Sequence, residues 1–250
     1  MYNIAANTLF IGKPFIYLPS CHSTNDIARE IVSNSQVQEG TTIVTSDQTA
    51  GKGQRGNKWE AEPGKNLTLS VILKPKGLPA SRQFLLNICI SLAVYEVLAK
   101  YLGEKVKIKW PNDLFYEDKK LCGILIENTI RGEYIETAIV GIGININQEK
   151  FNEHRAVSLK MILGHEVMIE AVAALLLADI EANYLRLSKE AILRANYLKA
   201  LYWLNEERIF KARDSQFTGI IHNVDEMGRL LINTAEGERT FQFKEIQYIG

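Results

Sequence analysis

Three glycines with the spacing G-x-G-x-x-G lie among cationic side chains, and they are the first residues whose types and spacing could do chemistry. The glycines are Gly51, Gly53 and Gly56, and the cations between them are Lys52 and Arg55. Closely spaced glycines allow the backbone to approach a ligand and to aim N–H groups at an anion, while lysine and arginine add charge. The segment therefore predicts an anion-binding loop, with a solvated basic hairpin tip as the alternative.

The same spacing occurs in dinucleotide-binding turns, but the flanking residues exclude that interpretation. Such a turn follows a strand, opens a helix and meets an acidic residue about twenty positions later. Residues 60–64 read Glu-Ala-Glu-Pro-Gly, which cannot propagate a helix, and residues 67–73 alternate like a strand. The stretch about twenty positions past Gly56 reads Leu-Lys-Pro-Lys, without a carboxylate. The loop therefore joins two strands, 41–46 and 67–73.

A second group of polar residues follows a predicted strand. The run Lys-Trp-Pro-Asn-Asp occupies 109–113, and Lys119, Lys120 and Gly123 come after it. Pro111 breaks the strand ladder, so Asn112 and Asp113 lie at the strand end, where the carboxylate could hold a divalent cation. Lys109 and Lys120 could face a polyanionic substrate. An ordinary turn followed by solvated lysines is the alternative.

Glycines inside apolar strands form a third group. Gly123 interrupts one such strand, and Gly141 and Gly143 precede Asn145 in another. Two glycines at i and i+2 remove side chains from one face, which opens a slot for a flat ring or for close packing against a helix. A fourth group, Ser23-Thr24-Asn25, offers hydroxyls to a ligand, although helix capping explains it almost as well.

Several familiar catalytic patterns are missing from the sequence. It has no G-x-x-x-x-G-K-[ST], no G-x-S-x-G and no H-E-x-x-H, and its four histidines are scattered. Basic loops without an obvious protein nucleophile fit group transfer between bound substrates. Proximity and charge stabilisation would then supply most of the rate.

Composition narrows the classes of partner. The 250 residues carry 29 Lys+Arg and 29 Asp+Glu, which argues against a dedicated nucleic-acid binder. Cys21, Cys89 and Cys122 are odd in number and show no C-x-x-C spacing, as expected for buried thiols in a reducing compartment. The N-terminus lacks a signal-peptide pattern, and the apolar run 171–180 is too short to span a bilayer. We expect a cytoplasmic protein without nucleic-acid or membrane partners.

The elements that must position these groups alternate between strands and helices. A helix begins at Ser23 or Thr24, a long helix capped by Ser81 ends at Gly103, and Val106, Ile108 and Trp110 alternate as a strand. A strand pair, 121–128 and 134–146, is joined at Arg131-Gly132, and helices are expected over 166–187 and 189–204.

After Asn205 the sequence changes to short strands separated by turns at 225–228 and 235–238. Closely spaced short strands predict a small barrel. The expected fold is therefore α+β, with a mixed or antiparallel sheet and its helices over 1–204 and a small β-barrel over 205–250.

Taken in order, these motifs resemble the signatures of biotin–protein ligases. GKGQRGNKW at 51–59 is similar to the biotin-binding loop of that family, and KWPND, KKLCGILIE and GIGININ follow in the family's order. The resemblance covers essentially the whole chain. It implies a class II synthetase-like catalytic domain, a C-terminal SH3-like barrel, and the monofunctional form that lacks an N-terminal DNA-binding domain.

The resemblance implies a ligase that works in two steps. The biotin carboxylate attacks the α-phosphate of ATP, which gives biotinyl-5′-AMP and pyrophosphate. A specific lysine of a biotin carboxyl carrier protein domain then attacks the mixed anhydride and releases AMP. Mg²⁺ and the lysines would offset charge on the triphosphate. Pairing of two copies into a homodimer is left open.

The resemblance also assigns an expected role to each site residue. Biotin would be bound by Ser23, Thr24, Gln48, Gly51, Lys52, Lys120 and Gly123. ATP and the adenylate would be bound by Lys52, Arg55, Gly56, Trp59, Lys109, Asn112 and Asn145. Catalysis would rest on Lys120, Lys109, Asp113 and Arg55, and Asp113 would also hold the metal. Gln54 and Asn57 stand where better-known ligases have arginines, so Lys52 and Arg55 must supply most of the loop's charge.

Two alternatives remain beside this interpretation. A lipoate–protein ligase would use a related fold, but its RR-x-S-G-G-G-type loop is absent from the sequence. A non-enzymatic biotin or adenylate sensor would not need Lys109, Lys120 and Asp113. In either ligase, we expect the glycine loop to be mobile when empty and ordered by ligand.

Overall fold

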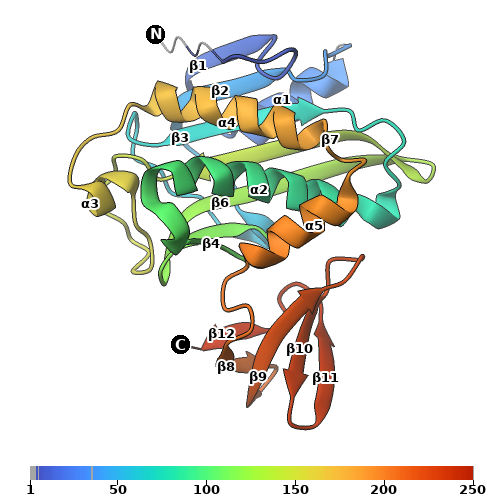
Figure 1. Cartoon of the computed structure of the whole chain (residues 1–250). Coiled ribbons are helices and arrows are strands. Elements are labelled where there is room, and N and C mark those ends of the chain that lie inside the picture. Colours follow the sequence, from blue (N-terminus) through green and yellow to red (C-terminus); the bar gives the residue numbers. More distant parts are fainter. Residues whose placement is uncertain (1–3, 5, 35, 250) are drawn as a thin grey trace.

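A seven-stranded mixed sheet forms the centre of the chain in a computed structural model, which describes residue 4 and residues 6–34 and 36–249. Its strand order is β1-β2-β3-β7-β6-β5-β4; β1 and β2 are parallel, and the other neighbours are antiparallel. The strands are β1 (Phe15–Cys21), β2 (Thr42–Gln48), β3 (Leu67–Leu73), β4 (Val106–Lys109), β5 (Asp113–Tyr116), β6 (Lys119–Arg131) and β7 (Tyr134–Ile144). The predicted α+β class with a mixed sheet is confirmed (Figure 1).

Helices cover both faces of this sheet. They are α1 (Thr24–Asn34), α2 (Gln83–Leu102), α3 (Leu159–Leu163), α4 (Ile169–Tyr184) and α5 (Glu190–Lys199). Side chains alternate between the faces of a strand. Ile43 and Ile72 accordingly pack with Ala28 of α1, while their neighbours Val44 and Val71 join the main core beneath α2 and α4. Every residue of β3 is buried, as expected for a strand covered on both sides.

The long helix α2 is the central core helix. Residues 80–105 are long and apolar enough to cross a bilayer by composition, but 61% of the apolar stretch is buried inside the fold. A helix that is apolar on all sides is expected where neighbours surround it. Gly103, with φ 68°, ends it as predicted. The predicted cap at Ser81 is wrong, because a 3₁₀ turn over Ala80–Arg82 precedes α2 and Arg82 occupies the cap without a side-chain bond.

The sequence prediction missed two strands and one short helix. β1 contains Pro19, and it lies at the edge of the sheet, where a missing N–H is tolerated. β5 and α3 span only four and five residues, too few to show a period. The predicted helices 166–187 and 189–204 are present as the shorter α4 and α5. After α5 the chain turns to meet β4, where the Ile108 N–H donates to the Ala200 carbonyl at 2.8 Å.

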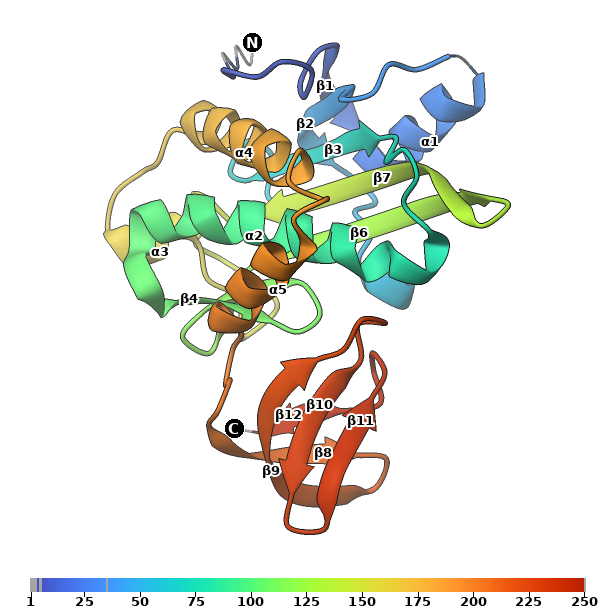
Figure 2. The same cartoon turned by 45° about the vertical axis from the view of Figure 1, so that its right-hand side comes forward.

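A second sheet follows the linker after α5. Its order is β11-β10-β9-β8-β12, with all four neighbouring pairs antiparallel. The strands are β8 (Glu207–Ala212), β9 (Ser215–Val224), β10 (Leu230–Thr234), β11 (Gly237–Phe241) and β12 (Gln247–Ile249). They lie within the range predicted for a small β-domain, and Figure 2 shows them beside the β4 end of the first sheet. The SH3-like class of this unit and the boundary at 204/205 stay predictions.

The turn between β9 and β10, in the second sheet, packs against residues around the first sheet. The indole Nε1 of Trp110 donates to the Gly228 carbonyl at 2.9 Å, and Arg194 of α5 donates to the Asp225 carbonyl at 3.1 Å. Gly228 has φ 84°, and a Cβ there would lie 2.4 Å from the Phe84 ring. The close approach fixes how the second sheet sits against the first.

Candidate active site

A pocket of about 840 Å³ gathers segments that lie far apart in the sequence. Its walls come from the start of α1, the loop 51–60, the strand end 109–113, the centres of β6 and β7, and residues 243–248 of the second sheet. The predicted site residues that line it are Ser23, Thr24, Gln48, Lys52, Trp59, Lys109, Asn112, Asp113, Lys120, Gly123 and Asn145. Of the predicted residues that the structure fully describes, Gly51 and Gly56 do not line it.

One end of the pocket is polar and uncharged. The side-chain oxygen of Gln48 accepts hydrogen bonds from the Thr24 N–H at 3.0 Å and the Thr24 hydroxyl at 3.3 Å. The Ser70 hydroxyl lies 2.7 Å from the Thr24 hydroxyl and 2.6 Å from the Asn25 side-chain oxygen. Ser23, Thr24 and Asn25 are almost fully buried. The arrangement presents fixed donors and acceptors to an uncharged ligand group. Ser70 was not predicted, although a polar residue in the buried strand β3 is a usable signal.

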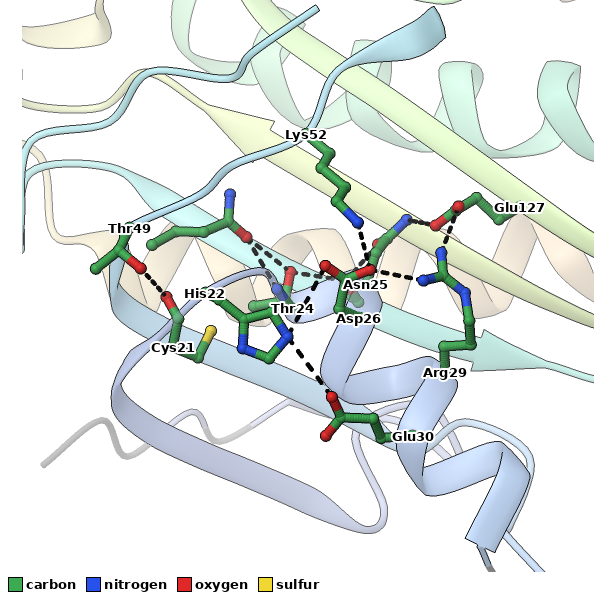
Figure 3. A network of polar contacts seen from close by, with 12 residues as sticks. Cys21, His22, Thr24, Asn25, Asp26, Arg29, Glu30, Thr49, Lys52 and Glu127 are labelled. Carbon is green, nitrogen blue, oxygen red and sulfur yellow. Dashed lines mark hydrogen bonds and ion pairs between the residues drawn. The ribbon is translucent and has the colours of Figure 1, made fainter. Parts of the chain in front are cut away.

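A charged network connects this end to the glycine loop (Figure 3). Lys52 Nζ and Arg29 both donate to Asp26 Oδ1 at 2.7 Å, and Arg29 also donates to Glu127 at 2.6 Å. The Asn25 amide donates to the other Glu127 oxygen at 2.7 Å. Burial alone would raise the pKa of Asp26, but hydrogen bonds from Lys52 and Arg29 outweigh it and hold that pKa below its ordinary value. Lys52 is therefore tied to α1, whereas the sequence predicted it to face biotin and the adenylate.

The start of the glycine loop has no room for a side chain. A Cβ at Gly51 would lie 2.4 Å from the Trp59 carbonyl oxygen and 2.6 Å from the Gln48 amide nitrogen, and the Trp59 N–H donates to the Gly51 carbonyl at 3.0 Å. Gly51 thus acts through loop closure and does not line the pocket. Gly56 has φ 86°, which a non-glycine residue rarely adopts. The side chain of Arg55 lies outside the described part of the structure.

Gln54 joins the loop to the strand end 109–113. Its amide donates to the Asn112 side-chain oxygen at 2.9 Å and to the Ile124 carbonyl at 3.3 Å. Asn112 in turn donates to Asn87 of α2 at 2.8 Å. The bond between Gln54 and Asn112 joins two uncharged amides. Through this contact, Gln54 anchors the loop to the strand end, and Asn112 is the acceptor that holds it there.

The slot predicted from Gly141 and Gly143 is present at Gly143, where a side chain of the protein itself fills it; Gly141 instead packs against α1, the alternative for this pair. Gly123 and Gly143 are directly paired across β6 and β7. A Cβ would lie 2.9 Å from the Trp59 ring at Gly123 and 2.3 Å from it at Gly143. A Cβ at Gly141 would lie 2.3 Å from the Asn25 side-chain oxygen. The paired glycines therefore form a bare floor on which the Trp59 indole lies.

The other end of the pocket carries lysines, and Lys109 is the more buried of them. Its Nζ lies 4.6 Å from the ring centroid of Phe115 and 4.8 Å from that of Tyr248. Burial lowers the pKa of Lys109 below its ordinary value, since the charged form is poorly solvated there. Tyr248 belongs to the second sheet and was not predicted as a site residue. No sequence motif pointed to it, because its position depends on how the two sheets meet.

Lys120 and Asp113 form an ion pair beside Lys109. Lys120 Nζ lies 2.7 Å from Asp113 Oδ2, and each side chain is about one-third exposed. The described residues contain no group of three or more His, Cys, Asp or Glu side chains that could cage a metal ion. Asp113 could serve only as a single carboxylate, and Mg²⁺ is commonly bound by one or two carboxylates together with substrate phosphates.

Asn145 lines the pocket and has an unused hydrogen-bond acceptor. Its amide nitrogen donates to the Val157 carbonyl at 3.1 Å, while its side-chain oxygen is buried and has no partner among the described residues. A buried acceptor without a partner costs free energy, about 1–3 kcal/mol. A ligand with an N–H donor at this point would remove that cost.

Comparison with known proteins identifies the family. Residues 17–145, just over half of the chain, match the family described as "Biotin/lipoate A/B protein ligase family". The chain belongs to this family.

Its relatives are named as biotin ligases. The bifunctional ligase/repressor BirA of Escherichia coli is 31% identical over 88% of this chain and 70% of its own length. The biotin--[acetyl-CoA-carboxylase] ligase of Paracoccus denitrificans is 27% identical over 83% of this chain and 90% of its own. A solved structure of the biotin protein ligase from Aquifex aeolicus in complex with biotin and ATP superposes with a TM-score of 0.78 at 28% identity, and the match covers 94% of this chain and 98% of that one.

Proposed function

We propose that this chain activates biotin with ATP and transfers it to a specific lysine of a biotin carboxyl carrier protein domain. One observation carries the proposal: a single pocket has an uncharged polar end, a floor of glycines and a basic end. Relatives named as biotin ligases, and the Aquifex aeolicus enzyme solved with biotin and ATP, support it.

The uncharged end suits the ureido ring of biotin. A ureido group has two N–H donors and one carbonyl acceptor, and hydroxyl and amide side chains can match both. Ser23 and Thr24, which are buried, and Gln48, which is half-buried, present such groups. The carboxylate tail of biotin would then run along the pocket toward Lys120.

The basic end suits the phosphates of ATP. Lys109 and Lys120 would offset charge on the triphosphate, since positioned cations stabilise charge that develops during phosphoryl transfer. We propose that Mg²⁺ binds together with ATP, with its phosphate oxygens as the main ligands and Asp113 as the single carboxylate of the protein.

The unused acceptor of Asn145 suits the exocyclic amino group of adenine. The Trp59 indole lies on the glycine floor, and both it and Asn145 line the pocket. A base that uses the same floor would need the indole to lift off and stack on its outer face, and offset stacking of aromatic rings is favourable. Trp59 would thus close the adenine side once the ligand is bound.

Positioning and charge stabilisation would supply most of the rate. A carboxylate is a poor acyl donor, and attack of its oxygen on the α-phosphorus of ATP, with loss of pyrophosphate, converts it into a mixed anhydride. Holding both substrates in one pocket makes the step effectively unimolecular, and a closed loop keeps water from the anhydride. The carrier amine then attacks the acyl carbon; the C–N bond forms, the bond from carbon to the phosphate oxygen breaks, the amine loses a proton and AMP leaves.

Biotin-dependent exchange of pyrophosphate into ATP tests the first step. We expect exchange with biotin and none above background with lipoate at the same concentration. Exchange with lipoate but not with biotin would favour the lipoate-ligase alternative. Biotin binding without exchange would favour a sensor.

A further inference from the structure

The ammonium group of Lys109 is held between two aromatic rings. Its Nζ lies at nearly equal distances from the ring centroids of Phe115, 4.6 Å, and Tyr248, 4.8 Å. In the described part of the chain, no hydrogen bond or ion pair to a carboxylate holds this ammonium. Lys120, by contrast, is paired with Asp113 at 2.7 Å. The rings thus hold Lys109 without neutralising its charge.

One of these rings comes from the other sheet. Phe115 is in β5 of the first sheet, whereas Tyr248 is in β12, close to the end of the chain. Tyr248 is fixed by further rings: its centroid lies 5.2 Å from that of Trp203 and 5.4 Å from that of Phe210. Its hydroxyl is buried without a partner among the described residues, so the ring face is the part of the side chain in use.

We propose that Tyr248 is a positioning residue for ATP, which holds the Lys109 ammonium toward the phosphate end of the pocket through its ring face. The inference rests on the proposed function, because it gives Lys109 an anionic substrate to meet. It also assigns a task to the second sheet, which supplies one wall of the phosphate site.

An aromatic ring holds a cation without neutralising its charge. A carboxylate in the place of Tyr248 would fix the lysine but would cancel the field that a triphosphate needs. The ring quadrupole attracts the ammonium by about 0.5–1 kcal/mol at exposed sites and by about 2 kcal/mol or more when water is excluded. Losing this attraction is equivalent to roughly a 3- to 30-fold change in affinity.

Kinetics of biotin-dependent ATP–pyrophosphate exchange in the full chain test the proposal. Tyr248→Leu removes the ring, Tyr248→Phe keeps it without the hydroxyl, and Phe217→Leu is the matched control, since Phe217 is an aromatic residue of the same sheet that does not line the pocket. We expect Tyr248→Leu to raise KM for ATP roughly 3- to 30-fold while KM for biotin stays within about twofold. Tyr248→Phe and Phe217→Leu should stay near the wild type for both substrates.

A double-mutant cycle separates positioning from a general effect on folding. In a Lys109→Met background, Tyr248→Leu should cause no further rise in KM for ATP, because the cation it holds is gone. A rise of the same size in both backgrounds, or an equal rise in Phe217→Leu, would overturn the proposal. If circular dichroism shows that Tyr248→Leu does not fold, Tyr248→Met fills the same space without a ring and takes its place.

Two different results would show that the proposed function is wrong or that only the role of Tyr248 is wrong. If the wild-type chain shows no biotin-dependent exchange, the proposed function is wrong. If the wild type exchanges normally and Tyr248→Leu has the same KM for ATP, only the role of Tyr248 is wrong.

Discussion

At the scale of single residues, three lysines of the pocket have three different environments. Lys52 is bonded to Asp26, Lys120 is paired with Asp113, and Lys109 lies between two rings. The sequence motifs placed all three at the site but could not distinguish them. Their partners distinguish them: Lys52 ties the loop to α1, whereas we propose that Lys120 and Lys109 face the substrates.

Replacing Lys120 tests its role in the first step. Lys120→Ala should reduce biotin-dependent ATP–pyrophosphate exchange by about 10²–10³-fold, since a positioned donor at developing charge is typically worth that much. Lys119→Ala is the matched control, because its exposed side chain does not line the pocket. Near-wild-type exchange in Lys120→Ala, or an equal loss in Lys119→Ala, would contradict the assignment.

The pH dependence of ATP use tests the state of Lys109. Burial is the main cause of its lowered pKa; Arg155 and Lys120 lower it further, while Asp113 and Asp118 act in the opposite sense. As pH rises, Lys109 therefore loses its charge earlier than an ordinary lysine, whose pKa is about 10.4. We expect kcat/KM for ATP to fall in the alkaline range below that value.

Lys109→Arg provides the comparison, because arginine stays charged throughout this range. The alkaline fall should disappear or move to higher pH in this variant, whereas Lys107→Arg, outside the pocket, should keep the wild-type profile. An unchanged alkaline fall in Lys109→Arg would show that another group titrates.

At the scale of elements, side-chain contacts hold the loop 51–60 at several points. Lys52 bonds to α1, Gln54 bonds to Asn112, and Trp59 lies on the paired glycines of β6 and β7. One of these contacts is an ion pair with a half-exposed lysine, which stabilises little, and another is a hydrogen bond between two uncharged amides. A loop held in this way can open for substrate and close over it.

Limited trypsin digestion tests this opening. Cleavage after Lys52 and Lys58 should be several-fold slower with biotin and ATP than without them, because closure hides the backbone from protease. Mass spectrometry of the fragments reports the sites, and cleavage elsewhere in the chain is the internal control. Equal rates at 51–60 in both states would argue against ligand-induced closure.

The contact between Trp59 and the glycine floor can be tested in the same assay. Gly143→Ala adds a Cβ that would lie 2.3 Å from the indole, so the indole must leave the floor. We expect several-fold faster cleavage of the ligand-free loop. In a Trp59→Ala background the same substitution should have no further effect; a further increase there would mean that the added methyl group acts elsewhere.

Sequence reasoning recovered the elements with a clear period and the motifs of the site. The strand 67–73 was predicted with its bounds, because its alternation is regular and turns flank it. The sequence patterns did not predict β1 and β5. They also could not show that Trp59 fills the slot between Gly123 and Gly143. That contact depends on the pairing of two strands and on the path of a loop, which no local pattern contains.

At the scale of the whole molecule, the pocket lies where the two sheets meet. The turn at Gly228 packs against Phe84 and Trp110, which fixes the second sheet beside the strand end 109–113. Residues 243–248 can then form one wall of the pocket. The C-terminal sheet is therefore part of the proposed site, and removing it would expose Lys109 to water.

Transfer of biotin to a carrier protein tests the central claim most directly. The purified chain is incubated with biotin, ATP, Mg²⁺ and a biotin carboxyl carrier protein domain, and intact-mass spectrometry follows the carrier. We predict one added biotinyl group, located on the acceptor lysine, and no addition when that lysine is replaced by arginine or when ATP is omitted. A carrier that remains unmodified while a known biotin ligase modifies it under the same conditions would contradict the account.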